Sequence, residues 1–594
     1  MNSESLAVQN FLSGRAERSG KWKSLLKSDP RRVVRALTLT GFSAESIDGD
    51  TPWDAQHILL ELEDVSKNAK GEVWKRLVNA GLIGALCDNV VKMGQVGVMH
   101  DPSTPRPSKE ELQRLQKQLP SPWYYPLAVI CSGLDNCATP PGATEMRVAE
   151  DLKKHWHSVT ERVWSDPSNS LEARATFERS VVAQIVGRVL TAIDPSLIEV
   201  LMDKKDRTFA VCMRNWLYSE GHMDCYLNAS VLLPFLDQGS PFYTPPSWKP
   251  YLERHPMPSA EVLLPRMIEG ASRHPEASAK KRNTEQTAAA IVAASAKHLA
   301  LPETALTILD LSLEVDLVRA LVDQAKTAFP ALPRAAYKSE SLWEGVVRAM
   351  RRAALAKKRK EKDYEVIMLV LSWCAKVSKR VQEEGAKTVD KLIYAWTTAG
   401  LLDVLEESLD FYVDQTSGGL GLVMILHELI ESIPKLSAKT TTALRAQFPR
   451  PHLVTQLKQA VGNVDDDPLF YQREIMKIDS GEQSPAAPSG LWKHGALEMV
   501  ESLTALLGSS GQCARRGCAK PATGPPCHVE RCEGTRYCST ACMEGCVCPL
   551  RDPSSRLTLN RDWNQHWEVC CDGDYKRIIE RNNAILDMNR YGTV

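Results

Sequence analysis

The sequence predicts a mostly α-helical protein that carries a small metal-bound module near its C-terminal end. Apolar residues recur at helical spacing through most of the 594 residues, and no sustained alternation of apolar and polar residues indicates a large sheet. The cysteines are distributed unevenly, since ten of the 16 fall between Cys513 and Cys571. A long helical region followed by a cysteine-rich end is therefore the expected architecture.

The composition bounds the size and class of the protein. At 594 residues the chain is too long for one compact core, so several domains or an array of repeats are expected. Lysine plus arginine (73) equal aspartate plus glutamate (73), so no overall charge draws the chain to nucleic acid or to anionic membranes. No run approaches the roughly 18 apolar residues of a membrane-spanning helix. We expect a soluble intracellular protein, in the cytoplasm or nucleus, without membrane or nucleic-acid partners.

The first hundred residues read as helices separated by short breaks. Pro30 can open a helix, because proline is tolerated in the first turn, and an apolar stripe follows it. Thr51 and Pro52 have the character of the cap and the first position of another helix. Gly81 then separates a helix over 73–80 from a second helix that starts at the next residue.

The break at Gly81 recurs at Gly400. Both segments, 73–86 and 392–405, have Ala-Gly-Leu between two apolar helical stretches. Residues 194–201 resemble this pattern more weakly. This phrase is similar to the junction between successive helices in armadillo-type repeats, where glycine lets the chain turn sharply. The resemblance implies an armadillo-like helical solenoid. An ordinary helix-turn-helix that arose twice is the alternative.

Three proline-rich stretches interrupt the helical pattern, at 101–108, 138–143 and 239–259. Proline lacks a backbone donor and biases the preceding residue away from the helix, so loops or seams between subdomains are expected there. The third stretch also contains Trp248 and Tyr251. We interpret it as a loop pinned against helices, with a peptide-like docking strip as the alternative.

An amphipathic helix is expected from Leu342, where apolar residues recur at intervals of four. A basic run follows from Arg348 to Lys362, before an apolar stretch over 366–373. Cations stabilise the C-terminal end of a helix, which explains the run without a function. A nuclear localisation patch or a site for an acidic partner is the alternative.

The remaining boundaries follow from composition. Serine, glycine and proline predict a linker over 480–490, after a helical, armadillo-like region over 1–479. An amphipathic stretch predicts a connecting helix over 491–512, and the cysteine-rich module follows over 513–571. A last helix is expected over 572–594.

The cysteine-rich module needs a covalent or coordinative link to fold. It is rich in glycine, proline and charge, so it cannot bury enough apolar area to offset the entropy lost on ordering. Disulfides and a metal are the two candidates. The chain begins without the charged-then-apolar run of a secretory signal, so we expect its thiols in a reducing compartment. Zinc is therefore favoured.

The spacing of the donors predicts two zinc sites. Soft ligands occur as four pairs separated by three or four residues, and structural zinc takes four ligands tetrahedrally. Eight ligands thus make two structural sites that are closed to substrate. The predicted ligands are Cys513, Cys518, Cys527, Cys532, Cys538, Cys542, His566 and Cys570.

Two of these segments carry a family resemblance. Residues 537–542 read YCSTAC and residues 562–570 read DWNQHWEVC, which resembles a MYND-type zinc finger. In that family the ligand pairs interleave. The resemblance implies one zinc on the first and third pairs, which begin at Cys513 and Cys538. It implies a second zinc on the pairs that begin at Cys527 and His566. Because interleaving ties distant segments together, the loss of one metal should unravel both sites.

The sequence departs from the family pattern at three places. Four residues separate Cys527 from Cys532, where the family has a closer pair, and Met543 stands where a glutamine is common. An insertion follows Cys542 and contains Cys546 and Cys548. These two thiols, together with Cys571, are interpreted as spare, with substitution for a ligand as the alternative.

No catalytic or cofactor-binding motif is found apart from the zinc ligands. The stretch from His427 to Glu431 begins like a zinc-protease helix but lacks the second histidine. Gly419 and Gly421 lack the third glycine of a dinucleotide loop. MYND fingers sometimes accompany SET lysine methyltransferases, but only 24 residues follow Cys570, too few for the catalytic sequence expected there. The sequence therefore predicts a protein that is not an enzyme.

The expected function is that of a zinc-binding adaptor for protein–protein interactions. MYND-type fingers bind short proline-containing peptides, so the resemblance implies a peptide-docking surface around Tyr537, Met543 and Trp563. A helical solenoid offers a second extended face for partners. The alternatives are a nuclear transcriptional co-regulator with nucleic-acid contacts and, less favoured, a SET-type methyltransferase.

Overall fold

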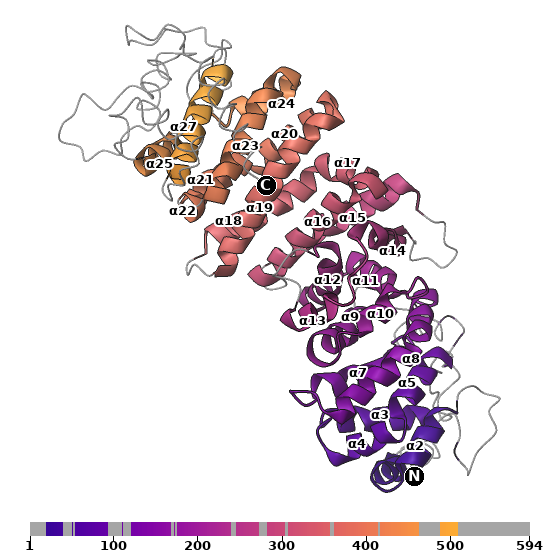
Figure 1. The fold of residues 1–594 in the computed structure, drawn as a ribbon. Coiled ribbons are helices and arrows are strands. Elements are labelled where there is room, and N and C mark those ends of the chain that lie inside the picture. The colour runs from indigo at the N-terminus through magenta and orange to yellow at the C-terminus, as the bar shows by residue number, and fades with distance from the viewer. Residues whose placement is uncertain are drawn as a thin grey trace, which may run out of the picture. The chain divides into compact units, whose positions relative to one another are not determined.

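The structure is a computed structural model of the 594-residue chain (Figure 1). It describes residues 19–39, 50, 54–92, 108, 110, 120–167, 172, 175–238, 245–272, 282–302, 307–356, 361–413, 416–461 and 487–508. Within these ranges the chain forms helices, turns and loops and has no β-strand, which confirms the mostly α-helical prediction. None of the helices in these ranges is long and apolar enough to cross a membrane.

The chain divides into two compact units, Met1–Leu332 (unit 1) and Pro333–Val594 (unit 2). Residues 19–28 of unit 1 are helical. The elements that follow in unit 1 are α2 (Pro30–Leu37), α3 (Asp54–Ser66), α4 (Glu72–Asn79), α5 (Leu82–Lys92), α7 (Tyr124–Asp135), α8 (Ala143–Ser165), α9 (Thr176–Arg188), the π-helix η1 (Val189–Ile193), α10 (Leu197–Met202), α11 (Thr208–Leu217), α12 (His222–Leu236), the 3-10 helix η2 (Pro246–Trp248), α13 (Lys249–Leu252), α14 (Ala260–Ser272), α15 (Thr284–Leu299) and α16 (Ile308–Ala328).

The helices of unit 1 pack as two layers. In one layer α3, α7, α9, α12 and α16 contact one another in succession, and in the other α5, α8, α11 and α14 do so. The neighbours α8 and α11 run parallel. Trp156 Nε1 in α8 donates to Thr208 Oγ1 at the start of α11 (2.9 Å), and Arg214 near the end of α11 donates to the carbonyl of Val163 near the end of α8 (2.8 Å).

The same parallel relation holds for α12 and α16. His222 Nδ1 at the start of α12 lies 2.7 Å from Asp310 Oδ1 at the start of α16. Near their ends, Gln324 Nε2 donates to the carbonyl of Leu236 (3.2 Å). Each layer therefore contains a pair of neighbouring helices that run in the same direction.

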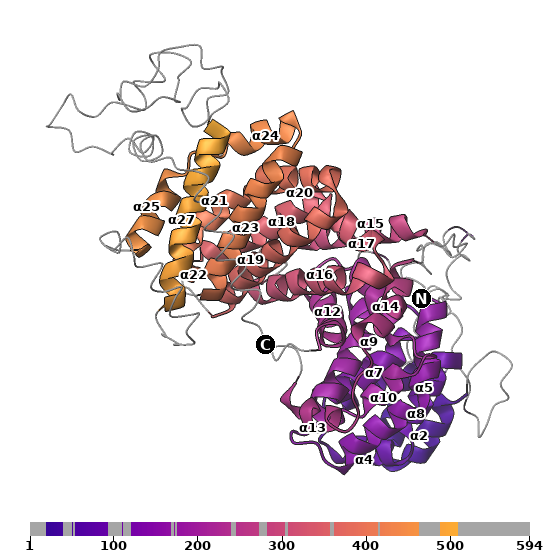
Figure 2. The ribbon, with the colours of Figure 1, turned by 45° about the horizontal axis from the view of Figure 1, so that its top comes forward.

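Unit 2 is built in the same way. After α17 (Ala331–Tyr337), which spans the boundary, it contains α18 (Glu340–Ala354), α19 (Glu361–Val381), the 3-10 helix η3 (Gln382–Glu384), α20 (Ala386–Ala399), α21 (Leu401–Glu407), α22 (Leu409–Tyr412), α23 (Thr416–Ser432), the 3-10 helix η4 (Ile433–Lys435), α24 (Ala438–Arg445), α25 (Pro451–Val461) and α27 (Ala487–Gly508). Figure 2 shows α19, α23 and α27 side by side, and these helices contact one another in succession. The second layer is α18, α20 and α24.

Large aromatic side chains fill the interior between the layers. In unit 2 the ring of Trp343 lies 4.9 Å from that of Trp373 and 5.4 Å from that of Trp396, centroid to centroid, so one cluster joins α18, α19 and α20. All three side chains are buried. Such aromatic clusters contribute through both buried area and ring geometry.

Both glycine breaks adopt a positive φ angle. Gly81 lies between α4 and α5 with a φ of 95°, and Gly400 lies between α20 and α21 with a φ of 78°. Residues with a Cβ atom rarely adopt positive φ angles, whereas glycine adopts them at no steric cost, which explains glycine at both breaks. The prediction of a helix, a glycine break and a second helix is confirmed at both positions.

The described part of the third proline-rich stretch is pinned against helices, as predicted, but its residues 246–252 form the short helices η2 and α13 where a loop was expected. Trp248 is buried and its Nε1 donates to the carbonyl of Leu190 (2.9 Å). Tyr251 is also buried, and its hydroxyl hydrogen-bonds Glu199 Oε1 (2.8 Å). The residues 245–252 thus pack against η1 and α10.

Candidate functional site

The predicted zinc site lies outside the described residues, because the described part of the chain ends at 508. This holds for all eight predicted ligands and also for Tyr537, Met543 and Trp563 of the expected peptide-docking surface. The zinc sites and their interleaved pairing therefore stay predictions.

The other six cysteines all lie among the described residues, where they are free thiols. Five of them are buried, Cys137 being the half-buried exception. Burial raises the pKa of the Cys87 thiol to about 12, so this thiol stays protonated at neutral pH. The described residues also contain no group of three or more histidine, cysteine or acidic side chains that is arranged to hold a metal.

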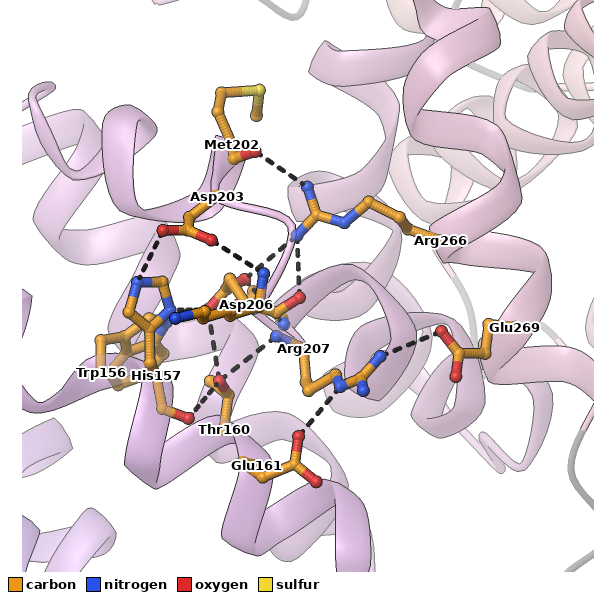
Figure 3. A network of polar contacts seen from close by, with 12 residues as sticks. Trp156, His157, Thr160, Glu161, Met202, Asp203, Asp206, Arg207, Arg266 and Glu269 are labelled. Atoms are coloured by element: carbon orange, nitrogen blue, oxygen red, sulfur yellow. Dashed lines mark hydrogen bonds and ion pairs between the residues drawn. The ribbon is translucent and has the colours of Figure 1, made fainter.

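The candidate site among the described residues is a polar cluster around Asp206, which we call the Asp206 cluster. It consists of His157, Thr160, Asp203, Asp206 and Arg266. Figure 3 shows these side chains converging from α8, from the turn between α10 and α11, and from α14. The cluster thus lies in the layer of unit 1 that contains α8, α11 and α14, at the point where these three helices meet.

Neutral donors hold the Asp206 carboxylate in place. Its Oδ1 accepts a hydrogen bond from the backbone N–H of Thr208 (2.9 Å), which fixes the first turn of α11. Its Oδ2 accepts one from Thr160 Oγ1 of α8 (3.2 Å). The side chain is fully buried, so the carboxylate depends on these partners for the solvation that water would otherwise supply.

One arginine approaches Asp206 from α14. The Nη2 atom of Arg266 donates to the backbone carbonyl of Asp206 (2.8 Å) and lies 3.7 Å from its carboxylate Oδ1. The guanidinium also lies over the ring of Phe209, 5.1 Å from the centroid. Arg266 therefore ties the turn before α11 to α14 and partly compensates the charge of Asp206.

His157 lies between two carboxylates. Its Nδ1 is 3.8 Å from Asp206 Oδ2, and its Nε2 is 3.6 Å from Asp203 Oδ2. Both separations exceed a hydrogen bond, and the buried Nδ1 has no hydrogen-bond partner.

The two carboxylates differ in their pKa values. Burial raises the pKa of Asp206 to about 6, although the hydrogen bonds from Thr208 and the charge of Arg266 oppose that shift. The backbone N–H of Lys205 donates to Asp203 Oδ1 (2.8 Å) and holds the pKa of Asp203 below its ordinary value, with a smaller contribution from His157. The cluster can therefore exchange a proton near neutral pH, but it contains no nucleophile placed for covalent chemistry.

The sequence did not reveal the Asp206 cluster. The Asp-Lys-Lys-Asp stretch over 203–206 has the short polar residues that commonly precede a helix, and this was the available signal. Nothing in the sequence pairs it with His157, which looks like any polar residue of a long helix. The two stretches that were compared with enzyme motifs both lie in α23, and this helix continues past His427 to Ser432. Gly419 of the same helix packs against the ring of Trp492.

Comparison with protein-family models, with curated proteins and with solved structures found no match to this chain.

Proposed function

We propose that the protein is a zinc-binding adaptor that uses its C-terminal MYND-type finger to capture proline-containing peptide segments of other proteins. The observation that carries this proposal is the donor pattern of residues 513–570, together with the YCSTAC and DWNQHWEVC segments. Seven cysteines and one histidine in closely spaced pairs are a donor set that suits structural zinc. When bound, two zinc ions would supply the cross-links that hold the finger folded, and they would leave no open coordination position for catalysis.

We further propose that both units are armadillo-like. The support is the recurring separation of residues that bond within a layer. In unit 1, Trp156 and Thr208 are 52 residues apart, and Arg179 and Asp224 are 45 apart. In unit 2, Gln382 Nε2 donates to Ser432 Oγ, 50 residues away. These separations are close to or slightly above the repeat of about 40 to 47 residues in armadillo and HEAT proteins.

The packing of α27 bears on how the finger would be presented. This helix ends at Gly508, a few residues before the first predicted ligand, Cys513. Trp492 and Leu503 of α27 are buried, and Arg445 Nε of α24 donates to the carbonyl of Leu507 (2.6 Å). The finger would therefore be attached to unit 2 through a helix that is packed at both ends.

Zinc and peptide binding by the full-length chain test the proposal. Wild-type protein should contain two zinc ions per chain by elemental analysis, and Cys538→Ser should lose them because the pairs interleave. Cys137→Ser, which changes a half-buried thiol far from the finger in sequence, is the matched control and should keep both. Trp563→Ala should keep zinc and lose binding to a library of proline-containing peptides. Peptide binding that survives Trp563→Ala would contradict the docking surface.

The second candidate is a transcriptional co-regulator with nucleic-acid contacts. Binding of DNA or RNA would weaken steeply as salt rises, because phosphate contacts release counterions. The balance of 73 basic and 73 acidic residues disfavours this candidate. Salt-dependent binding of a labelled oligonucleotide by the full-length chain would favour it over the adaptor.

A further inference from the structure

The buried hydroxyl of Ser295 in α15 has no hydrogen-bond partner among the described residues. A serine inside a helix commonly donates to a carbonyl three or four residues earlier on the same helix. Other buried serines of this chain do so, among them Ser180, Ser378 and Ser502. The hydroxyl of Ser295 does not reach the carbonyls of its own helix, so it needs a partner of another kind.

One turn later, His298 is fully buried and only half satisfied. Its Nδ1 lies 3.0 Å from Glu314 Oε1 of α16, and the other oxygen of Glu314 accepts a hydrogen bond from Trp216 Nε1 of α11 (2.9 Å). The Nε2 atom of His298 has no partner among the described residues. This atom is an acceptor when the ring is neutral and a donor when the ring is charged. It therefore needs a hydrogen-bond partner in either state.

The two unsatisfied atoms lie on one face of α15. Residues three apart on a helix are neighbours, and a long side chain leans back over the preceding turn, so the ring of His298 covers the turn that carries Ser295. The two side chains do not bond each other directly. Leaving a buried polar group unpaired is costly, and here two such groups stand together. A small molecule that can both donate and accept hydrogen bonds would satisfy both.

We propose that unit 1 has a binding site for one buried water molecule between Ser295 Oγ and His298 Nε2. Buried waters occupy sites of this kind, where they bond two to four polar groups that are otherwise unsatisfied. The water completes a hydrogen-bonded chain from Ser295 through His298 and Glu314 to Trp216, which joins α15 to α16 and α11. A metal ion does not suit the site, because the described residues contain no group of three or more donors arranged to hold one.

A crystal structure of the full-length protein, at a resolution that shows ordered waters, tests the site directly. We expect an isolated peak of electron density within about 3.2 Å of both Ser295 Oγ and His298 Nε2, which is the distance of a hydrogen bond. The absence of such a peak would overturn the proposal. So would a Ser295 hydroxyl that is turned to the carbonyl of Ile291, four residues earlier, because this bond would satisfy it without a water.

Two serine variants of the full-length protein test the same site. Ser295→Ala removes one partner of the water and leaves His298 Nε2 poorly satisfied, so the midpoint of thermal unfolding should fall by about 2 °C. Without a bound water the same change would only remove an unsatisfied hydroxyl, so an unchanged or higher midpoint would overturn the proposal.

Ser180→Ala is the matched control for the crystal structure, because Ser180 is also buried in a helix of unit 1 but donates to the carbonyl of Phe177 (3.0 Å). Crystals of Ser180→Ala should keep the density peak beside His298, and crystals of Ser295→Ala should lose it. A peak that persists unchanged in Ser295→Ala would show that the serine does not hold the water, and would overturn the proposal.

Discussion

The indole ring of Trp492 lies directly against the backbone of Gly419, so that a Cβ atom built at Gly419 would come within 1.9 Å of the ring. Gly419 belongs to α23 and Trp492 to α27, and the tryptophan is buried. The absence of a side chain on α23 is therefore what allows α27 to pack closely. Gly419, which the sequence places in a glycine-containing stretch, therefore has a packing role.

Gly419→Ala should loosen α27. The added methyl group has no space, and overpacking a well-packed interior typically costs about 1–3 kcal/mol. Hydrogen exchange of residues 487–508 in the full-length chain should show the loss of protection. Gly421→Ala on the same helix is the control, because its nearest neighbour is the flexible side chain of Leu371, at 3.1 Å. Equal protection of α27 in the two variants would contradict this account.

Gly81→Ala should destabilise unit 1 through the backbone alone. No atom lies within 4 Å of a Cβ at Gly81, but its φ of 95° is a conformation that side chains disfavour at a cost of about 1–2 kcal/mol. Gly187→Ala in α9 also meets nothing within 4 Å, and its φ is not positive, so this variant should gain helical propensity. Thermal unfolding should give a lower midpoint for the first variant and an equal or higher one for the second. A midpoint for Gly81→Ala at or above that of the wild-type protein would contradict the prediction.

Asp206→Asn should change how stability depends on pH. The folded pKa of Asp206, about 6, exceeds its ordinary value of 3.8, so the native state holds the proton more tightly than the unfolded state. The stabilisation is fully present below pH 3.8 and is lost as pH rises through about 6, on the order of 3 kcal/mol in total. The asparagine side chain of the variant cannot titrate, so its stability should not fall in this way as pH rises. Urea unfolding of both proteins between pH 4 and pH 7 measures the difference, and parallel curves would contradict it.

Asp50→Asn should act with the opposite pH dependence. Asp50 is buried and forms ion pairs with Arg32 and Lys21, each at 2.8 Å. The hydrogen bond from Arg32 is the main cause that holds the pKa of Asp50 below its ordinary value of 3.8, with Lys21 assisting and burial opposing. The stabilisation is therefore present above pH 3.8 and is lost as pH falls through the lowered value.

At pH 7 the Asp50→Asn variant should be less stable than the wild-type protein by about 2 kcal/mol. The loss is smaller than for a fully buried ion pair, because Lys21 and Arg32 are partly exposed. The difference from the wild-type protein should shrink below pH 4. Urea unfolding at pH 7 and pH 3.5 checks both points. A difference that grows on acidification would show that the sign is wrong.

Local backbone and packing features could be predicted from the sequence because their causes are local. Gly81 and Gly400 break helices through their own conformational freedom, and Trp248 lies in a proline-rich stretch whose apolar area needed a partner. Contacts between separate helices could not be predicted. The meeting of His157 with Asp206, and of Gly419 with Trp492, depends on how α8 packs on α11 and how α23 packs on α27, which no spacing within one helix encodes.

The division of the chain into two layered units likewise comes from packing. The sequence contains two clear copies of the Ala-Gly-Leu break, which do not reveal the layers. The layers are defined by hydrogen bonds between distant helices, such as those of Arg179 with Asp224 and of Gln382 with Ser432. The finger is the reverse case. Its donors are readable from the sequence, and their arrangement lies beyond the described residues.

The zinc content of the purified full-length protein is the most direct test of the proposed adaptor. Elemental analysis should find two zinc ions per chain, and a chelator should remove both while the helical circular dichroism of the two units is largely retained, since structural zinc stabilises the module that binds it. One zinc per chain would mean that the pair of Cys527 and Cys532 does not complete a site. No bound zinc would contradict the MYND-type finger and, with it, the proposed function.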